Sequence, residues 1–516
     1  MNEHPFPPDD SFDGGNLDCG NGLLLLIRKH IDPLAPGQLL EILSSESSVA
    51  DDLPSWCRLT GNELVNQLEL PERRSFLVSK GAFQGVTAAE GADAAAAPPA
   101  RAPGAPRDSM PVTQPVLDVV VPDSLPDPAP APAIEPLSVM GVGSWPRPRW
   151  LLSALHEHMQ GRMPDADFQA TADDAVRLAV QAQERAGVDV VTDGEQRRDN
   201  YASFVGGLLD NCQLIPLTDL LPYVDDPEEF EREMNSLDVP AGEVRHPAVF
   251  GPLGRSRPLA CHEAAFVQRI SDRPIKVALP GPYLLTRTMW MECISDRAYE
   301  TREELAVDVV RVLREELHHL LAQGVALVQL DEPVLTEVAY GAEVAGRSFM
   351  CGALGERGET GEELDFAREL LQATLAGLPS ERLALHVCRG NWTRDESVAL
   401  SGDYEPLLPL LSNVPVGTVT LELCTPRAGD VDVLSQLPDH LRIGVGAVNQ
   451  KHARVETPDE IVAKVQRAVD LFGAERLLLN PDCGFATFAD NPITDAEVAE
   501  AKLASLVEAG RRLRGG

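Results

Sequence analysis

Short apolar runs alternate with amphipathic helical stretches over residues 137–516. Eight runs are candidate strands: Leu137–Ser144, Val188–Asp193, Ile275–Pro280, Val325–Asp331, Leu383–Cys388, Thr418–Glu422, Leu441–Val448 and Leu477–Cys483. Several stretches between them begin with Thr-x-x-Glu/Asp and end at Gly, which are signals for the start and end of a helix. This order predicts an α/β fold, a (β/α)8 TIM barrel with insertions. A doubly wound open sheet is the alternative, because periodicity alone fits both.

The residues before this zone divide by composition. Residues 1–11 are polar and acidic, and we predict a disordered tail. Residues 12–82 mix strand and helix signals and are predicted to form a small two-layer α/β domain. Residues 83–136 are dominated by Ala, Pro, Gly and Asp, and they carry too little apolar surface to offset the entropy lost on ordering. We therefore predict a disordered Ala/Pro-rich linker between the small domain and a barrel at 137–516.

Charge and cysteine usage limit the partners and the compartment. The formal net charge is −36, which argues against broad binding to nucleic acid or to an anionic membrane. The chain contains no apolar run of about 18 residues, and its N-terminus lacks a secretory pattern. Nine cysteines, an odd number, are spread along the sequence. We therefore expect a cytoplasmic protein with reduced thiols and with neither nucleic acid nor membrane as a partner.

Metal-binding residue types lie at the ends of three late candidate strands. His386 and Cys388 are two residues apart, which places both on one face of a strand. Glu422 and Cys483 end two further strands. Imidazole, two thiolates and a carboxylate form a tetrahedral Zn²⁺ set, although Cys424 competes for the fourth position. Zinc with two thiolate ligands is suited to binding a further thiol as thiolate, which points to alkyl transfer to sulfur.

Motifs along residues 137–516 resemble a known family. In order they are VGSWPRPRW, DGEQRRDNY, LPGPYLL, VQLDEPVL, LHVCRGNW, LELCTPRAGD, IGVGAVNQKHARVETPDEI and LNPDCGFAT. They resemble the catalytic barrel of cobalamin-independent methionine synthase and its shorter relatives. The resemblance implies a zinc-dependent S-methyltransferase of the 5-methyltetrahydropteroyltriglutamate–homocysteine type, which forms methionine from homocysteine. It also implies zinc ligands at His386, Cys388, Glu422 and Cys483.

The same resemblance assigns further roles. Glu195 and Asp331 would hold the amino group of the acceptor, and Ser144 with the backbone around Val142 and Gly143 would hold its carboxylate. Where the family places a proton-donating His, the closest register here is Lys451, with His452 adjacent; with Asp331 these form the expected catalytic set.

The chain lacks the duplicated first barrel of full-length methionine synthases. We therefore keep 5-methyltetrahydrofolate and a methyl-corrinoid protein as alternative donors. A different zinc-dependent alkyl transfer, between another thiol and a corrinoid or epoxide donor, is the runner-up.

Cys19 lies just before an apolar helical stretch, NGLLLLIRKHIDPL. A thiol at the start of a helix is a candidate low-pKa thiolate. The run LDCGNGLLLLIRKHIDPLAPGQLLEILSS resembles the TusA-like sulfur-carrier family, whose Cys-Pro-x-Pro is Cys19-Gly20-Asn21-Gly22 here. The resemblance implies a persulfide on Cys19 and a sulfur-relay protein as partner. A sulfur-trafficking protein that uses Cys19, with a barrel that only binds the acceptor, is a third hypothesis.

Overall fold

The protein is described by a computed structural model and forms two compact units, Met1–Val116 and Leu117–Gly516. The described residues are 4–15, 23–31, 34–46, 49–50, 53–54, 57, 62–70, 73–81, 83, 119, 122, 124–216, 245–290, 295, 298–340, 359–391, 394, 396, 399–489 and 492–515. Cys19 lies outside them, as do residues 84–118 of the predicted linker. Within the part of the chain that is described, no helix is both long and apolar enough to cross a bilayer.

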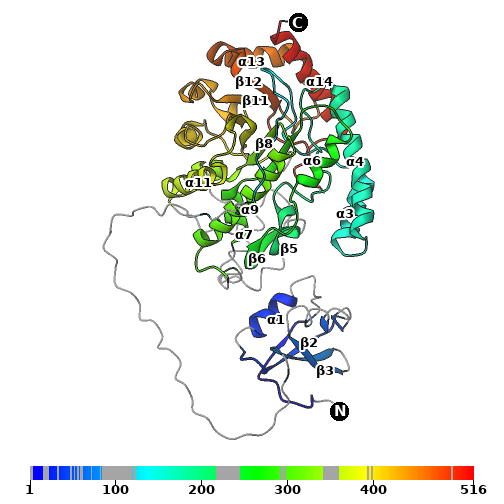
Figure 1. Cartoon of the computed structure of the whole chain (residues 1–516). Coiled ribbons are helices and arrows are strands. Elements are labelled where there is room, and N and C mark those ends of the chain that lie inside the picture. The colour runs from blue at the N-terminus through cyan, green and yellow to red at the C-terminus, as the bar shows by residue number, and fades with distance from the viewer. Residues whose placement is uncertain are drawn as a thin grey trace, which may run out of the picture. The chain divides into compact units, whose positions relative to one another are not determined.

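The first unit contains a four-stranded sheet and helix α1 (Figure 1). The elements are β1 (Asp10–Asp13), α1 (Leu23–Ile31), β2 (Leu39–Ser44), β3 (Glu63–Glu69) and β4 (Arg74–Ser79). The strand order is β1-β2-β4-β3, with β1 parallel to β2 and the other pairs antiparallel. Leu23, Ile27 and Ile31 of α1 pack into one apolar core with Ile42 of β2 and Phe76 of β4.

The predicted disorder of residues 1–11 is wrong for residues 4–11. Asp9 donates its backbone N–H to the carbonyl of Leu39 (2.7 Å), and β1 then pairs with β2. His4 Nε2 lies 2.7 Å from Ser75 Oγ. The backbone of this polar segment is held because it completes the edge of the sheet, a pairing that composition does not reveal.

The second unit contains a six-stranded parallel sheet in the order β12-β11-β10-β9-β8-β7. The strands are β7 (Lys276–Pro280), β8 (Leu327–Asp331), β9 (Leu383–Val387), β10 (Thr418–Leu421), β11 (Arg442–Val448) and β12 (Leu477–Pro481). This consecutive order confirms the α/β prediction and differs from a doubly wound sheet, in which the strand order reverses.

The first two candidate strands appear as isolated bridges. Val139 bridges Leu479 of β12, Met140 bridges Val190, and Val191 bridges Ile275 beside β7, all in parallel. These bridges connect the two edge strands of the sheet through residues 139–140 and 190–191.

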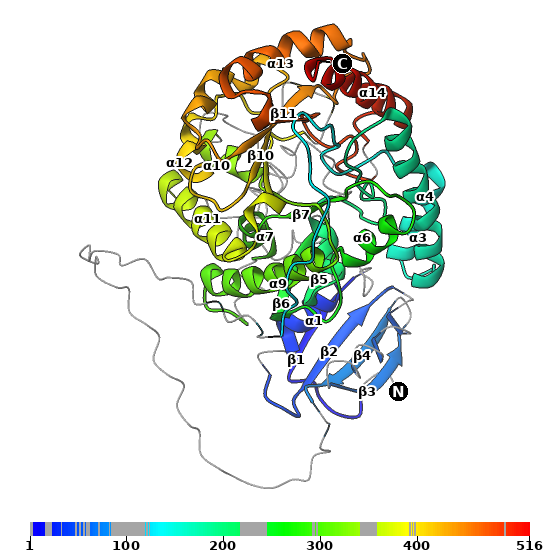
Figure 2. The same ribbon diagram turned by 45° about the horizontal axis from the view of Figure 1, so that its top comes forward.

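Helices alternate with the strands and lie around the outside of them (Figure 2). They are α3 (Arg149–Met159), α4 (Asp165–Ala186), α6 (Cys261–Gln268), α7 (Pro282–Met289), α9 (Arg302–Ala322), α10 (Val334–Tyr340), α11 (Thr360–Leu375), α12 (Leu408–Leu411), α13 (Pro458–Phe472) and α14 (Ala496–Leu513). Short 3-10 helices are η1 (Ser203–Gly207), η5 (Ser380–Arg382), η7 (Glu405–Leu407), η8 (Pro426–Ala428), η9 (Val431–Gln436) and η10 (Ala474–Arg476). An antiparallel pair, β5 (Asp210–Pro216) and β6 (Arg245–Gly254), follows residues 190–191. Thr457 and Glu460 form the predicted capping box of α13.

The predicted disorder of the linker is wrong for residues 124–136. Ala129 donates its backbone N–H to the carbonyl of Leu321 (3.1 Å), and Arg442 donates to the carbonyl of Ile134 (2.8 Å). His318 Nδ1 lies 3.1 Å from the carbonyl of Pro126. A proline-rich segment has few N–H donors but keeps its carbonyl acceptors, and basic side chains of the second unit use them.

Candidate active site

A pocket of ≈ 330 Å³ opens where several parallel segments of the second unit end. Its lining residues are Val142, Gly143, Ser144, Glu195, Tyr201, Asp331, Pro333, His386, Cys388, Cys483, Gly484 and Thr487. Eight residues predicted from the sequence therefore line the same pocket. Glu422, Lys451 and His452 are not part of its lining.

An imidazole and two thiols meet in this pocket. His386 lies in β9, Cys388 follows β9, and Cys483 follows β12. Their ligand atoms all lie within 4.8 Å of one another, and all three residues are buried. The hydrogen bond with Cys483 lowers the pKa of Cys388 to about 7, and the same bond raises the pKa of Cys483. The sulfur pair thus favours one thiolate near neutral pH.

The imidazole of His386 is oriented for a metal. Its Nδ1 lies 2.8 Å from Asp331 Oδ1. Because a carboxylate accepts hydrogen bonds, Nδ1 carries the proton and Nε2 presents a lone pair. Among the described residues, Nε2 has no hydrogen-bond partner although it is buried. A carboxylate behind an imidazole with a free second nitrogen is the usual arrangement at a zinc site, so these residues fit Zn²⁺.

Glu195, which also lines the pocket, has an unusual backbone conformation. Its backbone adopts a φ of 54°, a left-handed conformation that non-glycine residues rarely adopt. A Cβ atom at position 143 would lie 2.1 Å from Glu195 Oε1, so Gly143 leaves the room that this carboxylate occupies. Burial raises the pKa of Glu195 to about 7, although the nearby Arg198 lowers it. Strain of this kind is frequent at functional sites.

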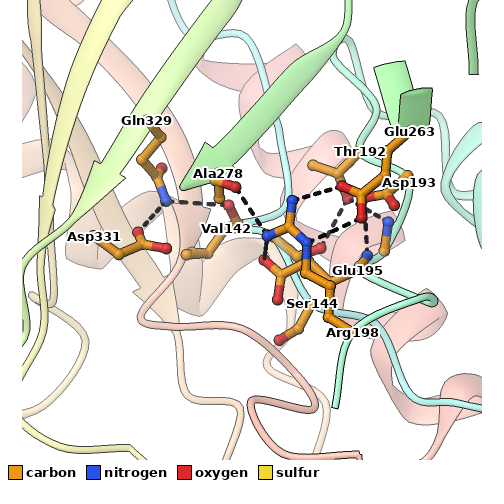
Figure 3. A network of polar contacts seen from close by, with 12 residues as sticks. Val142, Ser144, Thr192, Asp193, Glu195, Arg198, Glu263, Ala278, Gln329 and Asp331 are labelled. Atoms are coloured by element: carbon orange, nitrogen blue, oxygen red, sulfur yellow. Dashed lines mark hydrogen bonds and ion pairs between the residues drawn. The ribbon is translucent and has the colours of Figure 1, made fainter. Parts of the chain in front are cut away.

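A buried network of hydrogen bonds and ion pairs surrounds Glu195 (Figure 3). Arg198 donates to both carboxylate oxygens of Glu263 (3.2 and 2.6 Å) and to the carbonyl of Ala278 (2.9 Å). Its Nη1 also lies 3.9 Å from Glu195 Oε1. The backbone carbonyl of Glu195 accepts from Arg147 Nη2 (2.7 Å). The two guanidinium groups therefore fix both the backbone and the side chain of Glu195.

Ser144 is placed by the segment that follows β12. Its Oγ accepts from the N–H of Ala486 (3.3 Å), and its carbonyl accepts from the N–H of Phe485 (3.1 Å). A Cβ at position 484 would lie 2.2 Å from Ser144 Oγ. Gly484 therefore permits the close approach of Ser144, next to the metal-ligating candidate Cys483.

Glu422 and Cys424 have other hydrogen-bond partners, although the charge of Glu422 acts on the pKa of Cys388. Glu422 Oε2 accepts from Asn391 Nδ2 (2.7 Å), and Oε1 accepts from Arg427 Nε (2.8 Å). Cys424 Sγ accepts from Lys464 Nζ (2.8 Å). Neither residue belongs to the group of described side chains able to share one metal ion. The fourth ligand therefore remains a prediction.

Lys451 and His452 also lie away from the pocket lining. Lys451 is buried, and its charge is one of those that lower the pKa of Glu422 against the raising effect of burial. The His452 side chain is 59% exposed, and its Nε2 lies 3.1 Å from Glu396 Oε1. The two neighbours in sequence thus occupy different environments.

Sequence reasoning missed several contributors. Tyr201, Pro333, Gly484 and Thr487 line the pocket, and the contact of Asp331 with His386 was not foreseen. Glu332 accepts from the N–H groups of Tyr283 (2.8 Å) and Leu284 (2.9 Å) at the start of α7. The run Asp331-Glu332-Pro333 at a strand end was the available signal, but it does not separate the role of Asp331 in the pocket from the helix-capping role of Glu332.

Comparisons with known proteins agree with this arrangement. Residues 137–511 match the family described as cobalamin-independent synthase, catalytic domain. A methionine synthase of Sulfurisphaera tokodaii is 25% identical over 374 residues, covering 72% of this chain and 91% of that protein. A methionine synthase of Thermococcus kodakarensis is 26% identical over 384 residues, covering 73% and 92%. A 5-methyltetrahydropteroyltriglutamate–homocysteine methyltransferase of Acidithiobacillus ferrooxidans is 24% identical, covering 72% of this chain and 41% of that protein.

Among solved structures, a B12-independent methionine synthase from Shewanella sp. W3-18-1, in complex with selenomethionine, shares the fold. Its TM-score is 0.55 at 22% identity, covering 74% of this chain and 98% of that chain.

Proposed function

The chain belongs to the cobalamin-independent synthase catalytic-domain family, and from this premise we propose that it is a zinc-dependent S-methyltransferase that forms methionine from homocysteine. The observation that carries the proposal is the buried group of His386, Cys388 and Cys483, with the free Nε2 of His386 beside two thiols. The names of relatives, methionine synthase and homocysteine methyltransferase, support the same reaction. The connected parallel strands support a (β/α)8 barrel.

His386, Cys388 and Cys483 would hold the zinc, with Glu422 as the proposed fourth ligand. When bound, zinc lowers the pKa of the acceptor thiol, so that its thiolate persists near neutral pH. Asp331 keeps the imidazole of His386 in the ligating orientation.

The remaining residues of the pocket would position an amino acid. Glu195 and Asp331 provide carboxylates for its ammonium group, and Ser144 with the backbone of Val142 and Gly143 provides donors for its carboxylate. His386, Cys388 and Cys483 are buried, so an acceptor thiolate bound beside them would be largely shielded from water, which preserves its nucleophilicity.

We propose a methyl-folate as the donor and a methyl-corrinoid protein as its alternative. Lys451 or His452 would supply the proton that the leaving group of the donor requires. The buried Lys451 near Glu422 is the better placed of the two, since His452 is largely exposed.

The first unit is proposed as a sulfur carrier. In sequence, α1 begins at Leu23, shortly after Cys19, and follows the first strand of a four-stranded sheet. Cys19→Ser is expected to abolish persulfide labelling and to leave methyl transfer from a free donor intact, as measured by mass spectrometry and by methionine formation. Persulfide labelling that survives in this variant contradicts the carrier role.

The direct test is methionine formation by the purified full chain. Homocysteine would be supplied with methyl-folates of different glutamate length and, in parallel, with methyl-cobalamin, and zinc content would be measured on the same sample. We expect one zinc per chain and methionine from one of these donors. Loss of zinc and of activity in His386→Ala plus Cys483→Ala supports the proposal. A zinc-free active protein, or zinc retained by this variant, contradicts it.

A further inference from the structure

A lysine lies buried beneath the pocket. Lys276 of β7 is 1% exposed, and its Nζ donates to Gln329 Oε1 on the neighbouring strand β8 (3.0 Å). Burial lowers the pKa of Lys276 to about 7, although the negative charges of Asp331 and Glu195 favour its ammonium form. An ammonium group has three donors and no acceptor. In that form Lys276 can only donate, which matches the amide oxygen of Gln329 that faces it.

The other end of this amide faces the pocket (Figure 3). Gln329 Nε2 donates to Asp331 Oδ1 (2.7 Å) and to the carbonyl of Val142 (3.3 Å). Asp331 Oδ1 also accepts from His386 Nδ1 (2.8 Å). A reversed amide would place its oxygen against a carboxylate and a carbonyl, which repel it. The direction of each hydrogen bond is thus fixed by the preceding one, from β7 through β8 to β9.

We propose that Lys276 and Gln329 are positioning residues for the metal site, acting through Asp331 to hold His386 with Nδ1 protonated and Nε2 directed at the metal. The inference rests on the proposed function, because it requires a metal at His386, Cys388 and Cys483. Neither Lys276 nor Gln329 touches the metal or the acceptor. The contact of Gln329 with the Val142 carbonyl also connects the proposed acceptor-binding segment to the same network.

The test is zinc affinity, measured by competition with a chelator on the full chain. Lys276→Met and Gln329→Met are each expected to weaken zinc binding by about 10- to 100-fold, the usual cost of losing a partner behind a ligand. A purely electrostatic role predicts the opposite for Lys276→Met, because removing a cation favours a second cation. Gln329→Met changes no charge and preserves the test if Lys276→Met fails to fold.

Lys502→Met is the matched control. Lys502 is also fully buried, and its Nζ donates to Glu456 Oε2 (2.7 Å) outside the pocket lining. Its loss should lower stability without changing zinc affinity.

A second measurement separates positioning from stability. Long-range ¹H–¹⁵N spectra of the metal-free protein report the imidazole tautomer, and His386→Gln assigns the signal. We expect the Nδ1–H tautomer in the wild type and a mixture in Gln329→Met. The inference is overturned if Lys276→Met and Gln329→Met bind zinc within twofold of the wild-type affinity or more tightly. It is also overturned if the His386 tautomer in Gln329→Met is the same as in the wild type. A wild type that binds no zinc instead contradicts the proposed function.

Discussion

Replacing Gly143 by Ala tests the placement of Glu195 directly. The added Cβ would lie 2.1 Å from Glu195 Oε1, whereas real Cβ contacts essentially never fall below 3.0 Å, so the carboxylate must retreat by about 3.0 − 2.1 = 0.9 Å. Misplacement by about 1 Å costs on the order of 100-fold in a positioned site, or ~2.7 kcal/mol. We therefore expect kcat/KM for homocysteine, and affinity for methionine, to fall by about 100-fold.

The stability of the variant should change little. Rotating Glu195 off its rotamer costs about 0.5–1.5 kcal/mol, and Gly→Ala restores about 0.4–1 kcal/mol by restricting the unfolded chain. Gly141→Ala is the control, because a Cβ there meets nothing within 4 Å. Calorimetric titration with methionine and thermal unfolding would be run on both variants. Equal methionine affinity in Gly143→Ala and Gly141→Ala would refute the reasoning.

Three further predictions concern charged groups around the pocket. The pKa of Glu195 is raised to about 7, and its ionised form is the one proposed to bind an ammonium group, so methionine affinity should rise as pH increases through about 7 and then level off. Calorimetric titration of Glu195→Gln should show this rise largely removed. A wild type whose methionine affinity does not depend on pH would refute the role. Arg198→Met leaves the buried Glu263 without its partner and should cost about 3–5 kcal/mol in urea unfolding. Arg162→Met removes an exposed ion pair with Glu157 and should change stability little; equal losses would contradict this. Glu332→Ala removes the acceptor of two N–H groups at the start of α7 and should lower the free energy of unfolding by about 2 kcal/mol or more; an unchanged urea midpoint would argue against the cap.

The strand pattern was predictable because parallel strands covered by helices are buried on both faces. β7, β8, β9, β10 and β12 are buried at every position, and such strands read as continuous apolar runs. The shared face of His386 and Cys388 followed from the two-residue period of a strand. The segments around Val139 and Val190 were recognised, but they form single bridges. Hydrophobicity predicts their burial and not the extent of their pairing.

The position of a residue at a strand end does not reveal which neighbouring groups its side chain contacts. Glu422 directly follows β10, yet Asn391 from a loop and Arg427 from the 3-10 helix η8 bind its carboxylate. Lys451 and His452 follow β11 in a turn, where successive side chains need not alternate between two faces. One is therefore buried and the other largely exposed. The conformation of the segments between the strands decides both cases, and it is difficult to predict from a single sequence.

Asp331 shows how one carboxylate serves two parts of the site. Its Oδ1 is already committed to His386 and Gln329, so Oδ2 is the oxygen left for the ammonium group of an acceptor. An ammonium bound there would withdraw charge from the same carboxylate that orients His386. In the proposed function, acceptor binding and metal ligation would therefore be linked through Asp331. The sequence placed Asp331 at the end of a candidate strand. Which of its two oxygens remains available depends on Gln329, whose amide oxygen faces Lys276.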